Sequence, residues 1–359
     1  MTLSGWTKSI NIKLYSRVEL FNYQVNFIVH RSNGTNFADN IFIGTDCLEN
    51  FNDIRFTSTT DEVYSYWIES SDSSSATIWV KIPSIAANTY TDIVLQYGNS
   101  EASAVSNGDA TFEFFDDFDS ETLNTTTKWT VNSNQPYSIS NSILTLTGIN
   151  DATDYISSKL TFSIGYTLRM RSRCPNPNHD SIIGFYDGDY DELNLHHTHG
   201  YASRDGHEIS GSTADGSSFH IYEFQRISDK LSIINQDTTN LLITTNIGTI
   251  SINSLQIWLR QYMSDSNQMH DWVLIRKMSP DIEPTKYYPQ ILLMNWNYRR
   301  GHTLTSDTPL TDYQVKIHIY RTEGTSTGDT VYLGSKCLAS YDDIRFVASN
   351  GVDELPYWM

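Results

Sequence analysis

Apolar and polar positions alternate with a period of two over many short stretches of this chain. In residues 23–29 every second side chain is apolar, and residues 78–82 and 93–97 are similarly rich in branched and aromatic residues. Such runs are typical of half-buried β-strands. Turn-forming residues separate the runs every eight to twelve positions, which predicts a β-sandwich for the first part of the chain.

The end of the chain repeats its beginning. Tyr23-Gln24-Val25 recurs as Tyr313-Gln314-Val315, and Asp53-Ile54-Arg55-Phe56 recurs as Asp343-Ile344-Arg345-Phe346. The offset stays at about 290 residues, and roughly a third of the positions are identical, which indicates a repeated domain. In the second copy we expect Tyr313, Val315, Ile317 and Ile319 to share the inward face.

The second copy ends without a counterpart of the strands at 78–97. A sandwich that lacks strands exposes an open edge and an apolar face. Two explanations stay open. The sequence is a fragment of a longer array, or a neighbouring subunit supplies the strands and the protein polymerises.

Residues 112–279 between the two copies predict a different β domain. Eight or more strands over about 165 residues favour a two-sheet jelly roll. We therefore expect an all-β chain in four parts. They are a β-sandwich at 1–111, a jelly roll at 112–279, a linker at 280–290 and an incomplete second sandwich at 291–359.

The charge balance restricts the partners. The chain carries 42 Asp and Glu against 24 Lys and Arg, a net charge of −18, which disfavours nucleic acid and anionic lipid. No stretch approaches the ~18 apolar residues of a membrane span, and the N-terminus lacks the features of a signal peptide. The composition resembles that of secreted β proteins, so we expect an extracellular, cell-surface or virion-surface location.

The outer copies resemble an uncharacterised family, known only as a domain of unknown function, from archaeal and bacterial surface proteins. The first copy carries the resemblance in Asp53-Ile54-Arg55-Phe56, Tyr66-Trp67-Ile68 and Tyr97-Gly98-Asn99. The second carries it in Trp296-Asn297-Tyr298-Arg299-Arg300 and Leu355-Pro356-Tyr357-Trp358. The resemblance implies an array of surface domains and assigns no activity.

The middle domain resembles the concanavalin A-like lectin and glucanase sandwiches, through Phe115-Asp116-Asp117-Phe118 at its start and Asp271-Trp272-Val273 near its end. Laminarinase-like members carry Glu-x-Asp-x-Glu on one strand, with the outer carboxylates as nucleophile and acid/base. This chain has Glu192, Asn194 and His196 at those positions. The carboxylate pair that glycoside hydrolysis needs is missing, so we expect no enzyme.

The same face can still bind sugar, because polar groups and aromatic rings on such a surface hydrogen-bond and stack on pyranose rings. The candidate glycan-binding residues are Glu192, Asn194, His196, Tyr186, Tyr222 and Trp258. An ordinary core or solvated role for these residues is the alternative.

Calcium is the cofactor that the resemblance implies. Related glucanases hold one structural ion through an aspartate that begins the last strand, and Asp271 matches it, with Asp116 or Asp117 near the second group of ligands. Oxygen ligands of this kind suit Ca²⁺. The acidic run 187–191 also resembles a calcium loop, but a solvated turn explains it equally well.

Several other residues have structural interpretations. Asp53 and Arg55 are two positions apart, which favours an ion pair along a strand edge over a ligand clamp. Trp6, Trp67 and Trp79 fit the core of the first sandwich. The cysteines at 47 and 337 occupy equivalent positions without a partner in either copy, which predicts buried free thiols.

These patterns together favour a non-enzymatic, multidomain surface protein with an adhesive or structural role, whose jelly roll binds a glycan or surface polysaccharide. Its other expected partners are further repeats or subunits of the same array. The alternatives are a polymerising filament or sheath subunit and, less favoured, a laminarinase-like glycoside hydrolase.

Overall fold

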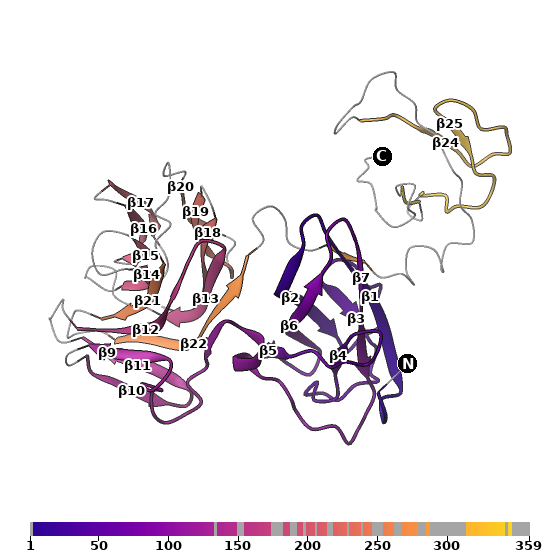
Figure 1. Ribbon diagram of the computed structural model, residues 1–359. Helices are drawn as coiled ribbons and strands as arrows, with labels where there is room; N and C mark the ends of the chain where they lie inside the picture. Colours follow the sequence, from indigo (N-terminus) through magenta and orange to yellow (C-terminus); the bar gives the residue numbers. More distant parts are fainter. Residues whose placement is uncertain are drawn as a thin grey trace.

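The computed structural model is almost entirely β-structure, which confirms the predicted fold class. Its one helix among the described residues is α1 (Gly108–Thr111). The structure describes residues 3–132, 135–148, 154–173, 182–186, 192–196, 199–204, 207–213, 218–227, 230–237, 240–245, 254–261, 267–278, 285–287, 314–341 and 344–346. Figure 1 shows the sandwich and the jelly roll side by side.

The first domain is a sandwich of two four-stranded sheets. Its strands are β1 (Lys8–Ser16), β2 (Leu20–His30), β3 (Asn40–Phe42), β4 (Arg55–Thr57), β5 (Tyr66–Ser71), β6 (Ser75–Ile85), β7 (Thr89–Tyr97) and β23 (Thr285–Tyr287). Sheet A has the order β23-β1-β7-β4, and sheet B has the order β3-β2-β6-β5. Tyr23, Val25, Phe27 and Val29 all lie in the core, each at most 2% exposed, as the alternation predicts.

The second domain is a jelly roll of two larger sheets. Sheet C has the order β10-β11-β22-β13-β18-β19-β20, with β8 paired to β22, and sheet D has the order β17-β16-β15-β14-β21-β12-β9. The strands of sheet C are β8 (Phe114–Asp116), β10 (Tyr137–Ser140), β11 (Ile143–Thr147), β13 (Tyr166–Arg173), β18 (His220–Ile227), β19 (Lys230–Asn235), β20 (Asn240–Thr245) and β22 (Asn267–Lys277). Those of sheet D are β9 (Trp129–Asn132), β12 (Tyr155–Phe162), β14 (Ile182–Tyr186), β15 (Glu192–His196), β16 (His199–Arg204), β17 (His207–Thr213) and β21 (Leu255–Arg260).

The core of the jelly roll lies between sheets C and D. Leu168, Phe224 and Ile275 from sheet C meet Phe185 and Ile257 from sheet D, and all five are wholly buried. Because side chains alternate along a strand, the residues between them belong to the two outer faces. The two outer faces differ. The sandwich covers part of the outer face of sheet C, and the outer face of sheet D carries the candidate site.

Trp67 and Trp79 lie outside the core of the sandwich, contrary to the sequence-based expectation. Both are buried, but they pack with Phe112, Phe115 and Trp272 in a separate cluster between the two domains. Each tryptophan sits on sheet B with its side chain on the side facing away from the sandwich core. The sequence shows that such a residue is apolar, but only the fold shows which neighbour buries it.

The linker contributes a strand that the sequence did not predict. Residues 285–287, within the expected linker 280–290, form β23 and pair antiparallel with β1, with Leu14 opposite Lys286. The side chain of Lys286 forms an ion pair with Asp39 and lies over the ring of Phe27. The chain therefore leaves the jelly roll and returns to the edge of the first sandwich (Figure 1).

The described part of the second copy consists of β24 (His318–Tyr320) and β25 (Thr330–Tyr332), which pair in parallel. The pairing matches that of β2 with β3, where Val29 lies opposite Ile41, as Ile319 lies opposite Val331. Residues 314–317 form no strand, contrary to the expectation, and Val315 is 47% exposed. In the first copy the corresponding residues belong to β2 and pair with β6. In the second copy the described residues provide no such antiparallel partner for residues 314–317.

Candidate functional site on the outer face of sheet D

The candidate site lies on the outer face of sheet D, which we call the D face. Leu193, Ile257 and Leu259 pack into the core of the jelly roll. Period-two alternation therefore assigns Trp258 on β21, and positions 192, 194 and 196 on β15, to the D face.

The register of the sheet brings five of the six candidate glycan-binding residues together. Tyr186 on β14 lies opposite Glu192 on β15. Gly184 lies between Trp258 on one neighbouring strand and Asn194 on the other. His196 occupies the next row of the same face, opposite Ile182. The structure thus places these residues on three adjacent strands, although Leu193 is the only residue of β15 whose side chain it describes.

Trp258 is the centre of an aromatic group on the D face. The ring of Tyr155 on β12 stacks on it with centroids 3.6 Å apart and an interplanar angle of 17°. The ring of Tyr186 meets it edge-on at 4.7 Å. Sequence reasoning did not include Tyr155 among the candidates, although Tyr155-Ile156-Ser157 carries a short alternation that indicates a strand.

The indole of Trp258 has an unsatisfied hydrogen-bond donor. The residue is 6% exposed, and its Nε1 is buried without an acceptor anywhere in the part of the chain that the structure describes. A buried donor without a partner costs about 1–3 kcal/mol, so native proteins avoid it. Because Nε1 is buried, an acceptor from a bound molecule can reach it only if the rings packed on the indole move.

Tyr222 does not belong to this group. It lies on β18 in the opposite sheet, is 2% exposed and packs in the core of the jelly roll with Phe224. The alternation of Tyr222 with Phe224 is the pattern of inward-facing positions, so its side chain contributes to the core and we remove it from the candidate set.

The calcium site implied by Asp271 does not fit the residues around it. The carboxylate of Asp271 forms an ion pair with Arg171, whose guanidinium also lies over the ring of Phe219. A cation at Asp271 would compete with that guanidinium. No group of three potential protein ligands with acidic, histidine or cysteine side chains occurs among the described residues.

Asp116 and Asp117 have surroundings of a different kind. Asp116 accepts hydrogen bonds from the indole N–H of Trp129, at 2.7 Å, and from the backbone N–H of Phe118, at 3.1 Å. Burial raises the pKa of Asp116, and burial together with Asp119 raises the pKa of Asp117. Asp116 therefore links the start of the jelly roll to Trp129 on β9. Calcium binding stays a prediction, and this arrangement does not favour it. The acidic run 187–191 lies outside the described residues.

Asp53 and Arg55 do not form the expected ion pair. Asp53 is buried and accepts backbone N–H groups from Leu48 and Gly98, both at 2.9 Å. Arg55 donates to the backbone carbonyls of Asn52, Ile54 and Ser103 and lies 5.0 Å from the ring centre of Trp6. Both residues tie loops of the sandwich to its sheets, which is a structural role.

Cys47 and Cys337 are buried free thiols, as predicted. Burial, with a contribution from Asp53, raises the pKa of Cys47 to about 11. The guanidinium of Arg31 donates to the carbonyl oxygen of Cys47 at 3.1 Å, and Arg321 makes the same contact with Cys337 at 3.0 Å. The two copies therefore share this local geometry.

Residues 50–132 match a family described as a domain of unknown function, DUF2341. The match covers the second half of the sandwich and the start of the jelly roll. No curated protein matches the chain.

The jelly roll is similar to several solved structures. A β-1,3-glucanase from Mycobacterium marinum is 14% identical, with a TM-score of 0.36, over 46% of this chain and 98% of that one. A pseudo β-1,3-glucanase of Mycobacterium tuberculosis is 14% identical, with a TM-score of 0.35, over 48% of this chain and all of that one. A β-1,3-1,4-glucanase from a mouse hindgut metagenome is 16% identical, with a TM-score of 0.35, over 46% of this chain and 99% of that one.

Proposed function

We propose that this protein binds a glycan on the D face and does not cleave it. The observation that carries the proposal is the aromatic group on the D face, in which the indole of Trp258 contacts the rings of Tyr155 and Tyr186 and its buried N–H has no acceptor among the described residues. Sugar hydroxyl and ring oxygens supply acceptors, and the apolar faces of pyranose rings pack against aromatic rings. The positions of Glu192, Asn194 and His196 add further hydrogen-bonding groups in the adjacent rows.

Binding without cleavage follows from the residue types on β15. A retaining glycosidase needs two carboxyl groups about 5 Å apart, one as nucleophile and one as acid/base. Only Glu192 has a carboxylate among the three alternating positions, and His196 stands where the second carboxylate would be needed. The three alternating positions of β15 therefore lack the carboxylate pair that cleavage needs, which supports binding over hydrolysis.

The surrounding architecture suits a surface protein with an adhesive or structural role. The sandwich and the repeated segment support a jelly roll carried within an array of β domains. The net charge of −18 fits an uncharged polar ligand better than an anionic one. None of the helices in the described ranges could span a membrane. We propose that the protein acts outside a cell or on a virion.

The test is a glycan array probed with the full chain, followed by titration calorimetry with the best oligosaccharide. Trp258→Phe keeps an aromatic ring and removes the N–H, so it should weaken binding about 2- to 10-fold, the effect of one hydrogen bond. Trp6→Phe is the matched control, because its N–H bonds to Asp53 within the sandwich, and it should bind as the wild type does.

Three results would contradict the proposal. Equal affinity of Trp258→Phe and the wild type would remove the indole from the site. Release of reducing sugar from the bound oligosaccharide, lost in Glu192→Gln, would show a hydrolase in place of a binding protein. A folded wild-type chain that binds no glycan on the array would reject the proposed ligand class.

A further inference from the structure

The outer face of sheet C is covered by sheet B of the sandwich along an aromatic cluster. Trp67 and Trp79 come from the sandwich, and Phe112 comes from the segment that joins the domains. Trp272 and Leu274 on β22 and Phe115 on β8 come from sheet C. All six are at most 7% exposed. The ring of Trp67 meets those of Trp272 and Phe115 edge-on, at 5.5 and 5.0 Å. Such aromatic pairs add about 0.5–1.5 kcal/mol each beyond the burial of their area.

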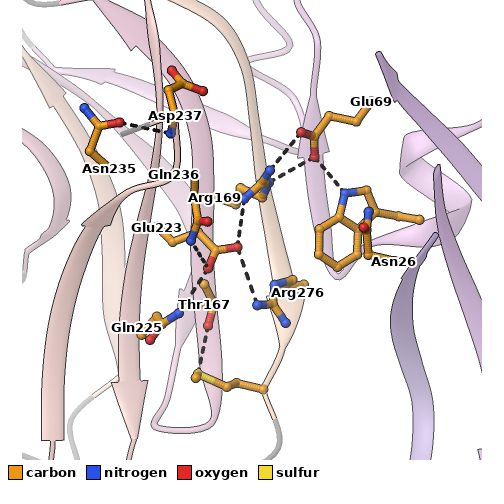
Figure 2. Close-up of polar contacts among 12 residues, drawn as sticks. Asn26, Glu69, Thr167, Arg169, Glu223, Gln225, Asn235, Gln236, Asp237 and Arg276 are labelled. Atoms are coloured by element: carbon orange, nitrogen blue, oxygen red, sulfur yellow. Dashed lines mark hydrogen bonds and ion pairs between the residues drawn. The ribbon is translucent and has the colours of Figure 1, made fainter. Parts of the chain in front are cut away.

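A buried ion network lies beside this cluster. Arg169 on β13 donates to both carboxylate oxygens of Glu69 on β5, at 2.8 and 2.9 Å. Arg169 and Arg276 both pair with Glu223, at 3.1 and 3.4 Å. Figure 2 shows the four side chains converging between the domains, where Glu69 also accepts the indole N–H of Trp79 at 2.7 Å.

The charges balance only when the two domains are together. The jelly roll supplies two guanidinium groups and one carboxylate, and Glu69 of the sandwich supplies the second carboxylate. Burial alone would raise the pKa of Glu223, but Arg276 and Arg169 outweigh it and lower the pKa. Without the sandwich, the same face would present an uncompensated positive charge next to exposed aromatic rings.

Polar contacts hold the jelly roll at both points where its chain crosses to the sandwich. At the first crossing, the side-chain amide of Gln24 donates to the carbonyl of Thr111 at 3.0 Å. At the second crossing, the side-chain oxygen of the same Gln24 accepts a hydrogen bond from the backbone N–H of Lys277 at 2.9 Å. The ammonium group of Lys277 donates to the carbonyl of Phe21 at 2.8 Å. One buried glutamine thus holds both chain crossings.

We propose that the outer face of sheet B is a docking surface for the outer face of sheet C in the jelly roll of this chain. This contact holds the two domains together even when the chain between them is cut. The face has the anatomy of a specific interface, with central tryptophans and a desolvated, charge-matched arginine. This assigns a role to the sandwich domain: it fixes one face of the jelly roll and leaves the D face free. The inference is independent of the proposed glycan ligand.

The experiment cuts both chain crossings in the folded full chain. One specific protease site is inserted between Ala104 and Val105, which are both exposed, and a second between Ser279 and Pro280, so that β23, which pairs with β1, is no longer connected to the jelly roll. The cleaved protein is examined by size-exclusion chromatography with light scattering over a dilution series. We expect the jelly-roll fragment to elute with the sandwich at micromolar concentration. Separation of the wild-type fragments at that concentration would overturn the proposal.

Two matched variants test the charge network. Glu69→Gln removes the carboxylate that faces Arg169 and should weaken the association of the nicked fragments about 30-fold or more, the effect of truncating one partner of a buried charge pair. Glu49→Gln removes a carboxylate whose side chain is 77% exposed, and should leave the association unchanged. Equal association of the two variants would show that the network does not hold the domains.

Discussion

His270 on β22 makes the jelly roll sensitive to acid. The ring is wholly buried, with Nδ1 2.8 Å from the hydroxyl of Ser172 and Nε2 2.8 Å from the side-chain oxygen of Gln268. The amide nitrogen of Gln268 donates to the carbonyl of Arg260 at 3.2 Å, which turns its oxygen toward the ring. The neutral ring therefore donates from Nε2 and accepts the Ser172 hydroxyl at Nδ1.

Burial lowers the pKa of His270 from 6.5 to about 3. As the pH falls, His270 of the unfolded chain binds a proton near pH 6.5, whereas His270 of the folded chain binds one only near pH 3. The stability that His270 contributes is therefore complete above pH 6.5 and falls with decreasing pH, by about 1.4 kcal/mol per unit within that window. Between pH 6.5 and pH 5 the expected loss is about 1.6 kcal/mol.

The assay is hydrogen–deuterium exchange of peptides that span β22, corrected for the intrinsic exchange rate at each pH. It reports the opening free energy of this strand separately from that of the sandwich. The perturbation is His270→Gln, which removes the titrating ring while the carboxylates of the protein stay the same. We expect the difference in opening free energy between wild type and variant to shrink by about 1.6 kcal/mol from pH 6.5 to pH 5. A difference that stays constant with pH would refute the reasoning.

Two further predictions concern the two cores. Phe224→Ala opens a cavity between sheets C and D and should lower the free energy of unfolding by about 3–5 kcal/mol, measured by urea denaturation; a loss below ~1 kcal/mol would contradict the described packing. Because the pKa of Cys47 is raised to about 11, this thiol should react with a thiol reagent about 100-fold more slowly in the folded than in the unfolded protein, followed by mass spectrometry of its peptide. Equal rates would show that Cys47 is accessible.

Hydrophobic alternation predicted the strands whose one face is buried and whose partners are nearby. The position of β2 follows directly from it, because burial of one face imposes a period of two on a strand. The same reasoning failed for β23, where three residues in a linker show too little pattern to detect. That strand forms because the edge of β1 offers unpaired backbone groups, which a sequence pattern does not record.

The site was predictable in part for a similar reason. The spacing of residues 192, 194 and 196 placed them on one face, and the register of β14 added Tyr186 beside them. Tyr222 was wrongly assigned to the D face. Alternation shows that residues share one face of a strand, but it does not show to which sheet the strand belongs or whether that face points to the core. Asp53 and Arg55 were paired on spacing, but each found backbone partners that only the folded loops provide.

The pairing of β23 with β1 makes the jelly roll an insertion between two parts of the chain that meet on the sandwich. The chain leaves the sandwich near Thr111 and is back on its edge at Thr285. The segment that leads to the second copy is therefore anchored on the first copy, whatever lies between the two crossings. An array of this design keeps its repeat spacing when the inserted domain is lengthened, shortened or exchanged for one with another ligand. Evolution can then vary what such an array binds while its reach stays the same.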